Sequence, residues 1–251
     1  MSQIGPLLKT WRTKRRLSQL DLALEAGVST RHLSFVETGR SRPSEQMVVH
    51  LAEQLDVPLR ERNRMLLAAG YAPIYSQRPL NELGPVKDAL DQLLKSHEPF
   101  PAIVVDRAWN VVAANAAIPM LTAGAAPHLL EPPINALRLS LHPDGMAPRI
   151  VNLGEWRAHL LRDLEAQVAA SNDDELTQLL EELQALPGPE GEPAPHEVFV
   201  PLRITSPGGG ELRFLSTRTT FATAVDVTVS ELAIESFFPA DAETAAYVAS
   251  R

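Results

Sequence analysis

The sequence predicts a multidomain protein: an all-α, five-helix domain at the N-terminus, followed by an α+β domain with a five-stranded antiparallel sheet. Three observations predict this. A length of 251 residues exceeds the usual size of one domain, about 100 to 150 residues. Helical periodicity dominates the first 70 residues, whereas β-branched runs come only after residue 99. The charge also changes sign, because residues 1–78 carry a net +5 and residues 79–251 carry −13.

The composition is that of an ordinary globular protein, with 45% hydrophobic and 22% charged residues. The absence of cysteine excludes disulfides, thiolate zinc sites and cysteine nucleophiles. No apolar run approaches the roughly 20 residues of a membrane helix, and the N-terminus lacks the pattern of a signal peptide. We therefore expect a cytoplasmic protein that does not enter a membrane.

Five short helices fit residues 1–78, each bounded by a hydroxyl, proline or glycine signal. They cover about residues 4–16, 18–27, 29–38, 43–55 and 58–70. Ser18 and Asp21 form a capping box at the start of the second helix, and Gly27 ends that helix. Residues 79–98 are expected to form a linker and a connecting helix, because a Pro-containing stretch gives way there to renewed helical periodicity.

Residues 99–251 read as strands, then helices, then strands, which is typical of an α+β domain. AIVVD and NVVAAN predict a first hairpin, and Asn115 is expected to cap the helix after it. Amphipathic helices are expected at 153–170 and 173–186, and the Pro-rich segment 187–195 is expected to be a surface loop. VFVPLRIT and ELRFLSTRTTF predict a second hairpin joined by SPGGG, and ELAIESFF predicts the fifth strand.

The second and third helices carry the spacing of a helix-turn-helix. Ala23, Gly27, Leu33 and Val36 are separated by three, five and two residues. The small alanine lets the helices approach, the glycine permits a tight turn, and the two aliphatic side chains fix the third helix to the core. The third helix is therefore the expected recognition helix.

The candidate DNA-binding residues lie on the outward face of that helix, at its start, at the start of the second helix and in the loop that follows. They are Gln19, Ser29, Thr30, Arg31, His32, Ser34, Phe35, Thr38, Arg40 and Arg42. Each arginine taken alone is typical of an ordinary surface charge, and Phe35 is equally a satellite of the core.

SQLDLALEAGVSTRHLSFVETGRSRPS resembles the XRE-type, lambda-repressor/Cro-like helix-turn-helix over about residues 4–70. In that family an arginine of the first helix and a glutamate near the end of the recognition helix form a buried ion pair. The resemblance implies the same pair between Arg12 and Glu37 here, and double-stranded DNA as the partner.

RHLSFVETGRSRPS, VPLRERNRMLLAAGYAP, HEPFPAIVVDRAWNVVAAN, LHPDG and ELAIESFFPAD together resemble bacterial regulators with an MmyB-like ligand-binding domain. This resemblance covers nearly the whole chain and implies a PAS-like fold for the C-terminal part. It also implies a hydrophobic small-molecule ligand that resembles a fatty acid. A homodimer is expected, because helix-turn-helix proteins bind paired half-sites.

Alternation of apolar and polar residues along the second hairpin predicts which residues line a pocket between the sheet and its helices. They are Val198, Val200, Leu202, Ile204, Leu212 and Phe214, with Arg218 in register as a partner for a ligand carboxylate. The alternative is that the aliphatic residues simply fill the core and that Arg218 is a surface residue.

The sequence offers no catalytic residue, no metal site and no cofactor motif. None of the seven histidines pairs with another at i, i+4, and the HExxH, Walker and G-x-S-x-G patterns do not occur. His142 to Gly145 spell HPDG, which is a turn sequence. We therefore expect a non-enzymatic protein.

The sequence thus predicts a sequence-specific DNA-binding transcription regulator whose DNA affinity is modulated by a small hydrophobic ligand. Two alternatives stay open. In the first, the protein is a DNA-binding regulator whose C-terminal domain serves only dimerisation. In the second, it is an autoregulatory enzyme with an attached DNA-binding domain.

Overall fold

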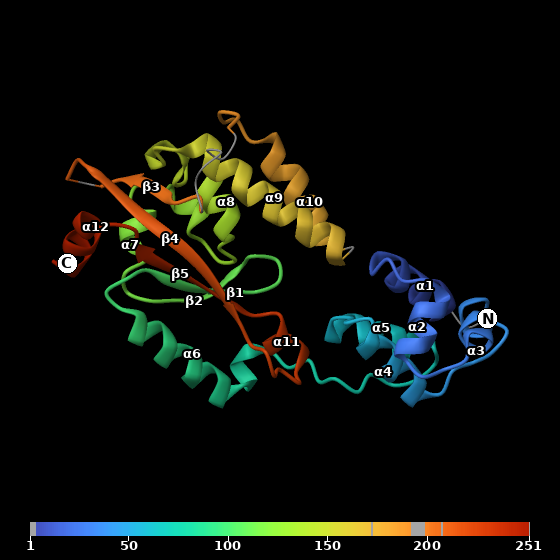
Figure 1. Ribbon diagram of the computed structural model, residues 1–251. Helices are drawn as coiled ribbons and strands as arrows, with labels where there is room; N and C mark the ends of the chain where they lie inside the picture. The colour runs from blue at the N-terminus through green and yellow to red at the C-terminus, as the bar shows by residue number, and fades with distance from the viewer. Residues whose placement is uncertain (1–3, 172, 192–198, 207, 251) are drawn as a thin grey trace. The chain divides into compact units, whose positions relative to one another are not determined.

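The computed structural model describes residues 4–171, 173–191, 199–206 and 208–250. The chain divides into two compact units (Figure 1). The N-terminal unit comprises residues 1–79 together with residues 223–230, and the C-terminal unit comprises residues 80–222 and 231–251. A segment from the second half of the chain therefore belongs to the N-terminal unit.

The five predicted helices of the N-terminal unit are confirmed. They are α1 (Ile4–Lys14), α2 (Gln19–Glu25), α3 (Thr30–Glu37), α4 (Glu45–Gln54) and α5 (Leu59–Ala68). Ser18, Ser29 and Ser44 cap α2, α3 and α4 by accepting a hydrogen bond from a backbone N–H in the first turn. The predicted capping box of Ser18 and Asp21 is complete.

Each helix of this unit contributes apolar side chains to one core, including Leu8, Leu22, Leu33, Leu51 and Leu66. Glycine is required where α1 meets the end of α3. A Cβ on Gly5 would lie 2.3 Å from the carbonyl oxygen of Glu37, so only glycine permits this approach.

The C-terminal unit contains one five-stranded, fully antiparallel sheet, as predicted. Its strands are β1 (Ala102–Val105), β2 (Val111–Ala114), β3 (Leu202–Thr205), β4 (Glu211–Thr220) and β5 (Ala233–Pro239), in the order β2-β1-β5-β4-β3. The helices are α6 (Gly84–His97), α7 (Pro119–Thr122), α8 (Ala136–Leu141), α9 (Leu153–Ser171), α10 (Asp174–Ala185) and α12 (Ala242–Ala249). Short 3-10 turns cover Leu80–Glu82, Pro127–Leu129 and Ala147–Arg149.

Both faces of the sheet are covered. Helices α8, α9 and α10 lie over one face, and α6 lies under the other (Figure 1). The side chains of β1 alternate accordingly: Ile103 belongs to the larger core, and Val104 packs with Leu90 and Leu94 of α6. The helix expected as a connector is thus part of the C-terminal unit.

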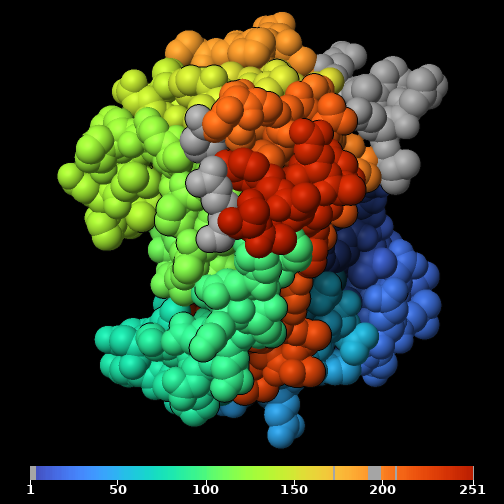
Figure 2. Space-filling view, turned by 90° about the vertical axis from the view of Figure 1, so that its left-hand side faces the viewer, coloured from blue at the N-terminus to red at the C-terminus, as the bar shows by residue number. Residues whose placement is uncertain are grey.

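The C-terminal helix α12 packs on strand β4. The backbone N–H of Arg213 donates to the buried Thr244 hydroxyl at 3.0 Å, and Asp241 caps the helix. Figure 2 shows this helix, in red, beside the orange strands of the sheet.

Two local expectations differ from the structure. Asn115 does not cap α7; its amide accepts from the Ala102 N–H and donates to the carbonyl of Phe100, which ties the ends of the first hairpin together. Strand β3 begins at Leu202 instead of residue 198, because Pro201 has no N–H to donate to a ladder.

Candidate DNA-binding surface and ligand cavity

The helix-turn-helix residues occupy the positions that their spacing predicts. Ala23, Leu33 and Val36 are buried, and Gly27 has the left-handed φ of 62° that a tight turn needs. The ring of His50 on α4 contacts the carbonyl of Ala26 in the turn, with 2.9 Å between Nε2 and the oxygen. His50 therefore ties α4 to the turn between α2 and α3.

The outward face of α3 is accessible to solvent. Arg31 and Thr38 are exposed, and the Arg31 guanidinium lies 5.3 Å from the centre of the Phe35 ring. The other predicted residues of this helix, Thr30, His32, Ser34 and Phe35, are partly exposed. Ser29 accepts from the His32 N–H as the helix cap, and Arg40 is exposed in the following loop.

Two of the candidate DNA-binding side chains, Gln19 and Arg42, bind residues that are distant in the sequence. Gln19 Nε2 donates to Glu37 at 2.6 Å. Arg42 donates to the carbonyls of Ala69 and Gly70 at 3.0 and 3.2 Å, and its guanidinium lies over Tyr71. These bonds join distant parts of the chain, so no local pattern reveals them.

The predicted ion pair between Arg12 and Glu37 is confirmed. Arg12 Nε and Nη2 donate to the two carboxylate oxygens at 2.7 and 3.0 Å, and Arg12 Nη1 donates to the Leu17 carbonyl. The side chains are 11% and 2% exposed. This bidentate pair joins α1 to the end of the recognition helix.

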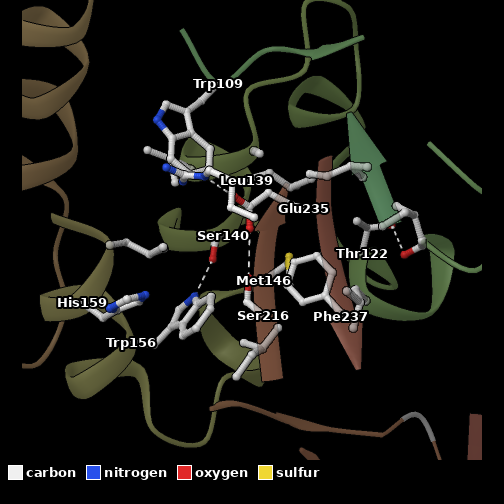
Figure 3. Close-up of a pocket in the computed structure, with 18 of the residues that line it drawn as sticks. Trp109, Thr122, Leu139, Ser140, Met146, Trp156, His159, Ser216, Glu235 and Phe237 are labelled. Carbon is white, nitrogen blue, oxygen red and sulfur yellow. Dashed lines mark hydrogen bonds and ion pairs between the residues drawn. The ribbon is translucent and has the colours of Figure 1, made fainter. Parts of the chain in front are cut away.

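A cavity of about 100 Å³ lies between the sheet and helices α7, α8 and α9 in the C-terminal unit (Figure 3). Its walls are mainly apolar and aromatic. The apolar lining residues include Ile103, Trp109, Leu121, Leu137, Leu139, Met146, Trp156, Leu160, Leu202 and Phe237.

Of the predicted lining residues, Leu202 and Arg218 line this cavity. Ile204, Leu212 and Phe214 are buried in the adjoining core without lining it, and Val200 packs against that core. The reason is their place along the strands: Ile204 pairs with Leu212 next to the turn of the hairpin, whereas the cavity lies toward the middle of β4 and β5. Val198 lies outside the described residues.

One side of the cavity is polar. Arg218 donates to Glu235 at 2.5 Å and pairs with Asp163 at 3.1 Å, and Ser216 donates to the second oxygen of Glu235 at 2.9 Å. The Arg218 guanidinium also lies 4.1 Å from the centre of the Trp109 ring. The single arginine of this wall is thus held by two carboxylates and an aromatic face.

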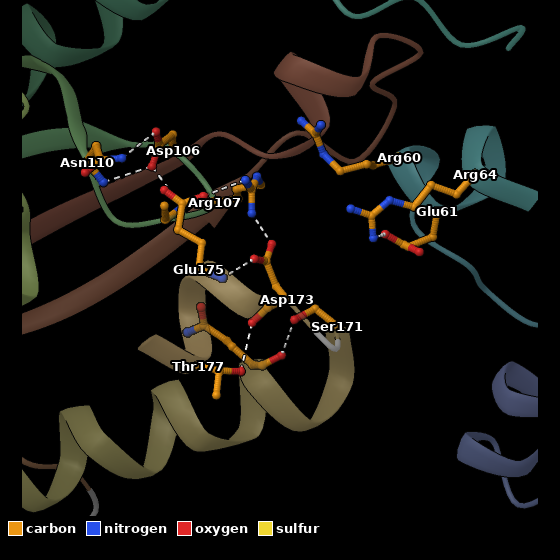
Figure 4. A network of polar contacts seen from close by, with 12 residues as sticks. Arg60, Glu61, Arg64, Asp106, Arg107, Asn110, Ser171, Asp173, Glu175 and Thr177 are labelled. Carbon is orange, nitrogen blue, oxygen red and sulfur yellow. Dashed lines mark hydrogen bonds and ion pairs between the residues drawn. The ribbon is translucent and has the colours of Figure 1, made fainter. Parts of the chain in front are cut away.

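Trp109 is positioned over the cavity by the turn between β1 and β2. It has a left-handed φ of 67°, which is unfavourable for a bulky residue. Asp106 supports the turn by accepting from the backbone N–H groups of Ala108 and Asn110 at 2.9 and 2.8 Å. Figure 4 shows this turn with Arg107, which pairs with Asp173 and Glu175 at the start of α10.

On the helical side, the Trp156 indole N–H donates to Ser140 at 3.0 Å, as Figure 3 shows. The neighbouring His159 is half-buried, and burial lowers the pKa of its imidazole. This lowered pKa favours the neutral form of the ring at pH 7.

A second, more open cavity of about 410 Å³ lies on the other side of α7. It is lined by Glu98, Pro99, Ala116, Ala117, Pro119, Met120, Ala123, Tyr247 and Val248. Arg149 holds α7 in place by donating to the carbonyls of Leu121 and Ala123, both at 2.9 Å. The short helix α7 therefore separates the two cavities.

The connection between β4 and β5 belongs to the N-terminal unit and contains the short helix α11 (Val227–Ser230). Its buried Asp226 accepts from the Ser76 hydroxyl at 2.7 Å and from Arg78 at 3.3 Å, and the Val227 N–H donates to the Ser76 carbonyl. Burial raises the pKa of Asp226, but these hydrogen bonds outweigh it and the pKa is lowered. The segment is thus hydrogen-bonded to residues 76–78. These residues follow helices α1–α5, which together we call the helical head.

One group of potential metal ligands occurs among the described residues. His128, His142 and Asp144 place their ligand atoms within 4.8 Å of one another. Nδ1 of His142 accepts from the Asp144 N–H at 3.0 Å, and the HPDG segment forms the predicted turn. No sequence pattern indicated this group, because His128 lies 14 residues before His142.

The N-terminal unit has an exposed recognition helix, and the C-terminal unit has an apolar cavity. Together they define the class of DNA-binding proteins that carry a separate domain for a small molecule. Residues 8–62 match the helix-turn-helix family model, and residues 86–250 match that of the MmyB-like transcription regulator ligand binding domain. The chain therefore belongs to the MmyB-like family, and it is a DNA-binding transcription regulator with a ligand-binding domain. A comparison with curated proteins finds no match.

Within the described part of the chain, none of the helices combines the length and the apolar character that a membrane crossing requires.

Proposed function

We propose that a small molecule in the cavity between the sheet and α7–α9 changes the affinity of the helical head for its operator. One observation carries this proposal. Strands β4 and β5 contribute Ser216, Arg218, Glu235 and Phe237 to the cavity, and the segment that joins these strands belongs to the N-terminal unit. A displacement of either strand is transmitted along the chain to that segment.

DNA is read by α3 in the major groove, in a cytoplasmic homodimer whose half-sites are about 34 Å apart, one helical turn, or a multiple of that. Arg31 contacts a base edge and Arg40 contacts the phosphate backbone. The net charge of +5 over residues 1–78 supports DNA binding by this part of the chain.

The ligand is hydrophobic or amphipathic and lies in a PAS-like sensor domain, in keeping with the family resemblance, which also implies a fatty-acid-like molecule. The apolar walls favour such a ligand, since each buried methylene contributes ~0.8 kcal/mol. A cavity of about 100 Å³ is smaller than an apolar cavity of ~150 Å³ that holds benzene. A long chain must therefore displace α7 and extend into the second cavity.

The test has two steps. Operator sequences are selected from a random duplex library with the intact protein, and small molecules that co-purify with it are identified by mass spectrometry. The proposal expects that the identified molecule, added to stripped protein, changes operator affinity by about fivefold or more. A selected operator whose affinity is unaffected by every bound molecule would contradict it.

A further inference from the structure

We propose that His128, His142 and Asp144 form a binding site for a divalent transition-metal ion such as Zn²⁺. The three side chains come from two turns of the C-terminal unit, the 3-10 turn Pro127–Leu129 and the HPDG turn that follows α8. None of the three lines the cavity between the sheet and α7–α9. The metal site is therefore separate from the proposed ligand site, and the two are tested independently.

The donor set is two imidazoles and one carboxylate. Their ligand atoms lie within 4.8 Å of one another, and Nδ1 of His142 is 3.9 Å from Oδ2 of Asp144. Bonds of about 2.0 to 2.2 Å place the ligands of a tetrahedral zinc ion about 3.4 Å apart. The donors therefore need to approach one another by about 1.4 Å at most. Imidazole nitrogens favour Zn²⁺, Ni²⁺ or Cu²⁺ over Mg²⁺ and Ca²⁺, which prefer oxygen.

The backbone beneath these side chains is fixed before any ion binds. The Ala126 N–H donates to the Asp144 carbonyl at 2.8 Å, which joins the two turns. Leu129 and Leu141, the neighbours of the two histidines in the sequence, are buried in the larger core. A Cβ on Gly145 would lie 2.2 Å from a carbonyl oxygen of α8, so only glycine lets the HPDG turn pack this closely. Only side-chain rotations are then needed to close the site.

The donors are accessible to an ion from solvent. His128 and Asp144 are exposed, the His142 side chain is 25% exposed, and the two imidazole rings meet edge to face with their centres 5.8 Å apart. Nδ1 of His142 accepts a hydrogen bond from the Asp144 N–H at 3.0 Å. An ion at Nδ1 replaces this bond, and water can bind the freed N–H because the turn is exposed.

The charges beside His142 are balanced. Glu182 interacts electrostatically with His142 and also accepts two hydrogen bonds from Arg138, at 2.5 and 2.7 Å. The repulsion that Arg138 alone would exert on a cation is therefore compensated. Asp144 adds a negative charge within the donor set, which favours a divalent cation.

The test is a calorimetric titration of Zn²⁺ into the full-length protein at pH 7, without an affinity tag. We expect one strongly bound ion per chain and at least about tenfold weaker binding of Mg²⁺. Bound Zn²⁺ should also raise the melting temperature, and a chelator should reverse this rise. Co²⁺ is a spectroscopic probe of the same site, because its visible absorption reports the ligand geometry.

The variants His128→Gln and Asp144→Asn each remove one ligand at an exposed position. Zn²⁺ affinity should fall at least about tenfold in both, because the loss of an outer-shell partner alone costs about 10- to 100-fold. Their melting temperatures without metal should match that of the wild type. Asp88→Asn makes the same change of charge at an exposed position of α6 and should keep the full Zn²⁺ affinity.

Equal Zn²⁺ affinities of the wild type and His128→Gln would overturn the proposal, since binding would then occur at another histidine. Binding of Mg²⁺ as tight as that of Zn²⁺ would also overturn it, because a carboxylate alone would then account for the site. The same holds if the wild type binds no Zn²⁺. None of these results bears on the proposed function.

Discussion

Glu37 ties the end of the recognition helix to α1 and α2. Its buried carboxylate accepts from Arg12 and Gln19, and its carbonyl oxygen abuts Gly5. The Glu37 side chain raises the pKa of Arg12, so this arginine stays charged throughout the accessible pH range. Removing the carboxylate therefore leaves a buried, unpaired cation.

The variant Glu37→Ala should lower the free energy of unfolding by about 3 kcal/mol, because breaking a buried pair strands the other charge. Thermal unfolding of the full-length protein, followed by circular dichroism, measures the loss. Glu25→Ala, at an exposed position of α2, is the control and should have little effect. Equal melting temperatures for the two variants would show that the pair contributes nothing.

Arg40 and Arg42 looked alike in the sequence, but the structure separates their roles. Arg42→Ala should lower the free energy of unfolding by about 1 to 2 kcal/mol, since two carbonyls lose their donor. Arg40→Ala should leave stability unchanged, weaken binding to all DNA sequences alike and reduce the salt slope by about 1. Thermal unfolding and salt-dependent DNA titrations check both variants. A loss of stability in Arg40→Ala, together with unchanged stability and weaker DNA binding in Arg42→Ala, would contradict these roles.

Arg31 is the candidate for reading a base. Arg31→Ala should weaken binding to the selected operator by about 1 to 3 kcal/mol and relax the preference at one base pair. Competition with operators altered at single positions measures this. A uniform loss of affinity for every sequence would instead make Arg31 a phosphate contact.

At the scale of elements, the hairpin of β3 and β4 is held at its turn by Glu211. Hydrogen bonds from Arg203 and Arg213 outweigh the effect of burial and lower the pKa of Glu211 from 4.5 to about 2. A lowered pKa means that the carboxylate stabilises the fold fully above pH 4.5 and loses that contribution as the pH falls toward 2.

The stability difference between wild type and Glu211→Gln should therefore be largest near neutral pH and vanish toward pH 2. Thermal unfolding of both proteins at several pH values measures this difference. A difference that does not change with pH would assign the effect to hydrogen bonding alone.

Sequence patterns predicted the elements well, because their signals are local. Ser18, Ser29 and Ser44 cap the helices at which they occur, and both predicted hairpins form. The sequence did not reveal contacts between distant residues, such as Arg218 with Asp163. It also missed the left-handed Trp109, whose conformation depends on the Asp106 turn.

The connection between β4 and β5 is the element that we expect to carry the signal. Asp226→Asn removes the charge that pairs with Arg78. We expect the protein still to bind DNA, but the ratio of its operator affinities with and without ligand should fall to about one. Asp88→Asn on α6 is the control and should keep the full effect. An undiminished ligand effect in Asp226→Asn would show that the signal takes another route.

At the scale of the whole molecule, charge and chemistry are divided along the chain. The basic first 78 residues carry the recognition helix, and the acidic remainder carries the cavity. The division itself was predictable from the sequence. The size of the cavity and the carboxylates in its polar wall were not, since they depend on how four strands and three helices meet.

The central claim is that occupancy of the cavity changes DNA affinity. Its most direct test is the dissociation constant of the full-length protein for a selected operator, measured by fluorescence anisotropy with stripped protein and with protein saturated by its co-purified ligand. We predict a change of about fivefold or more. The same dissociation constant in both states, with calorimetry showing the ligand bound, would contradict the account.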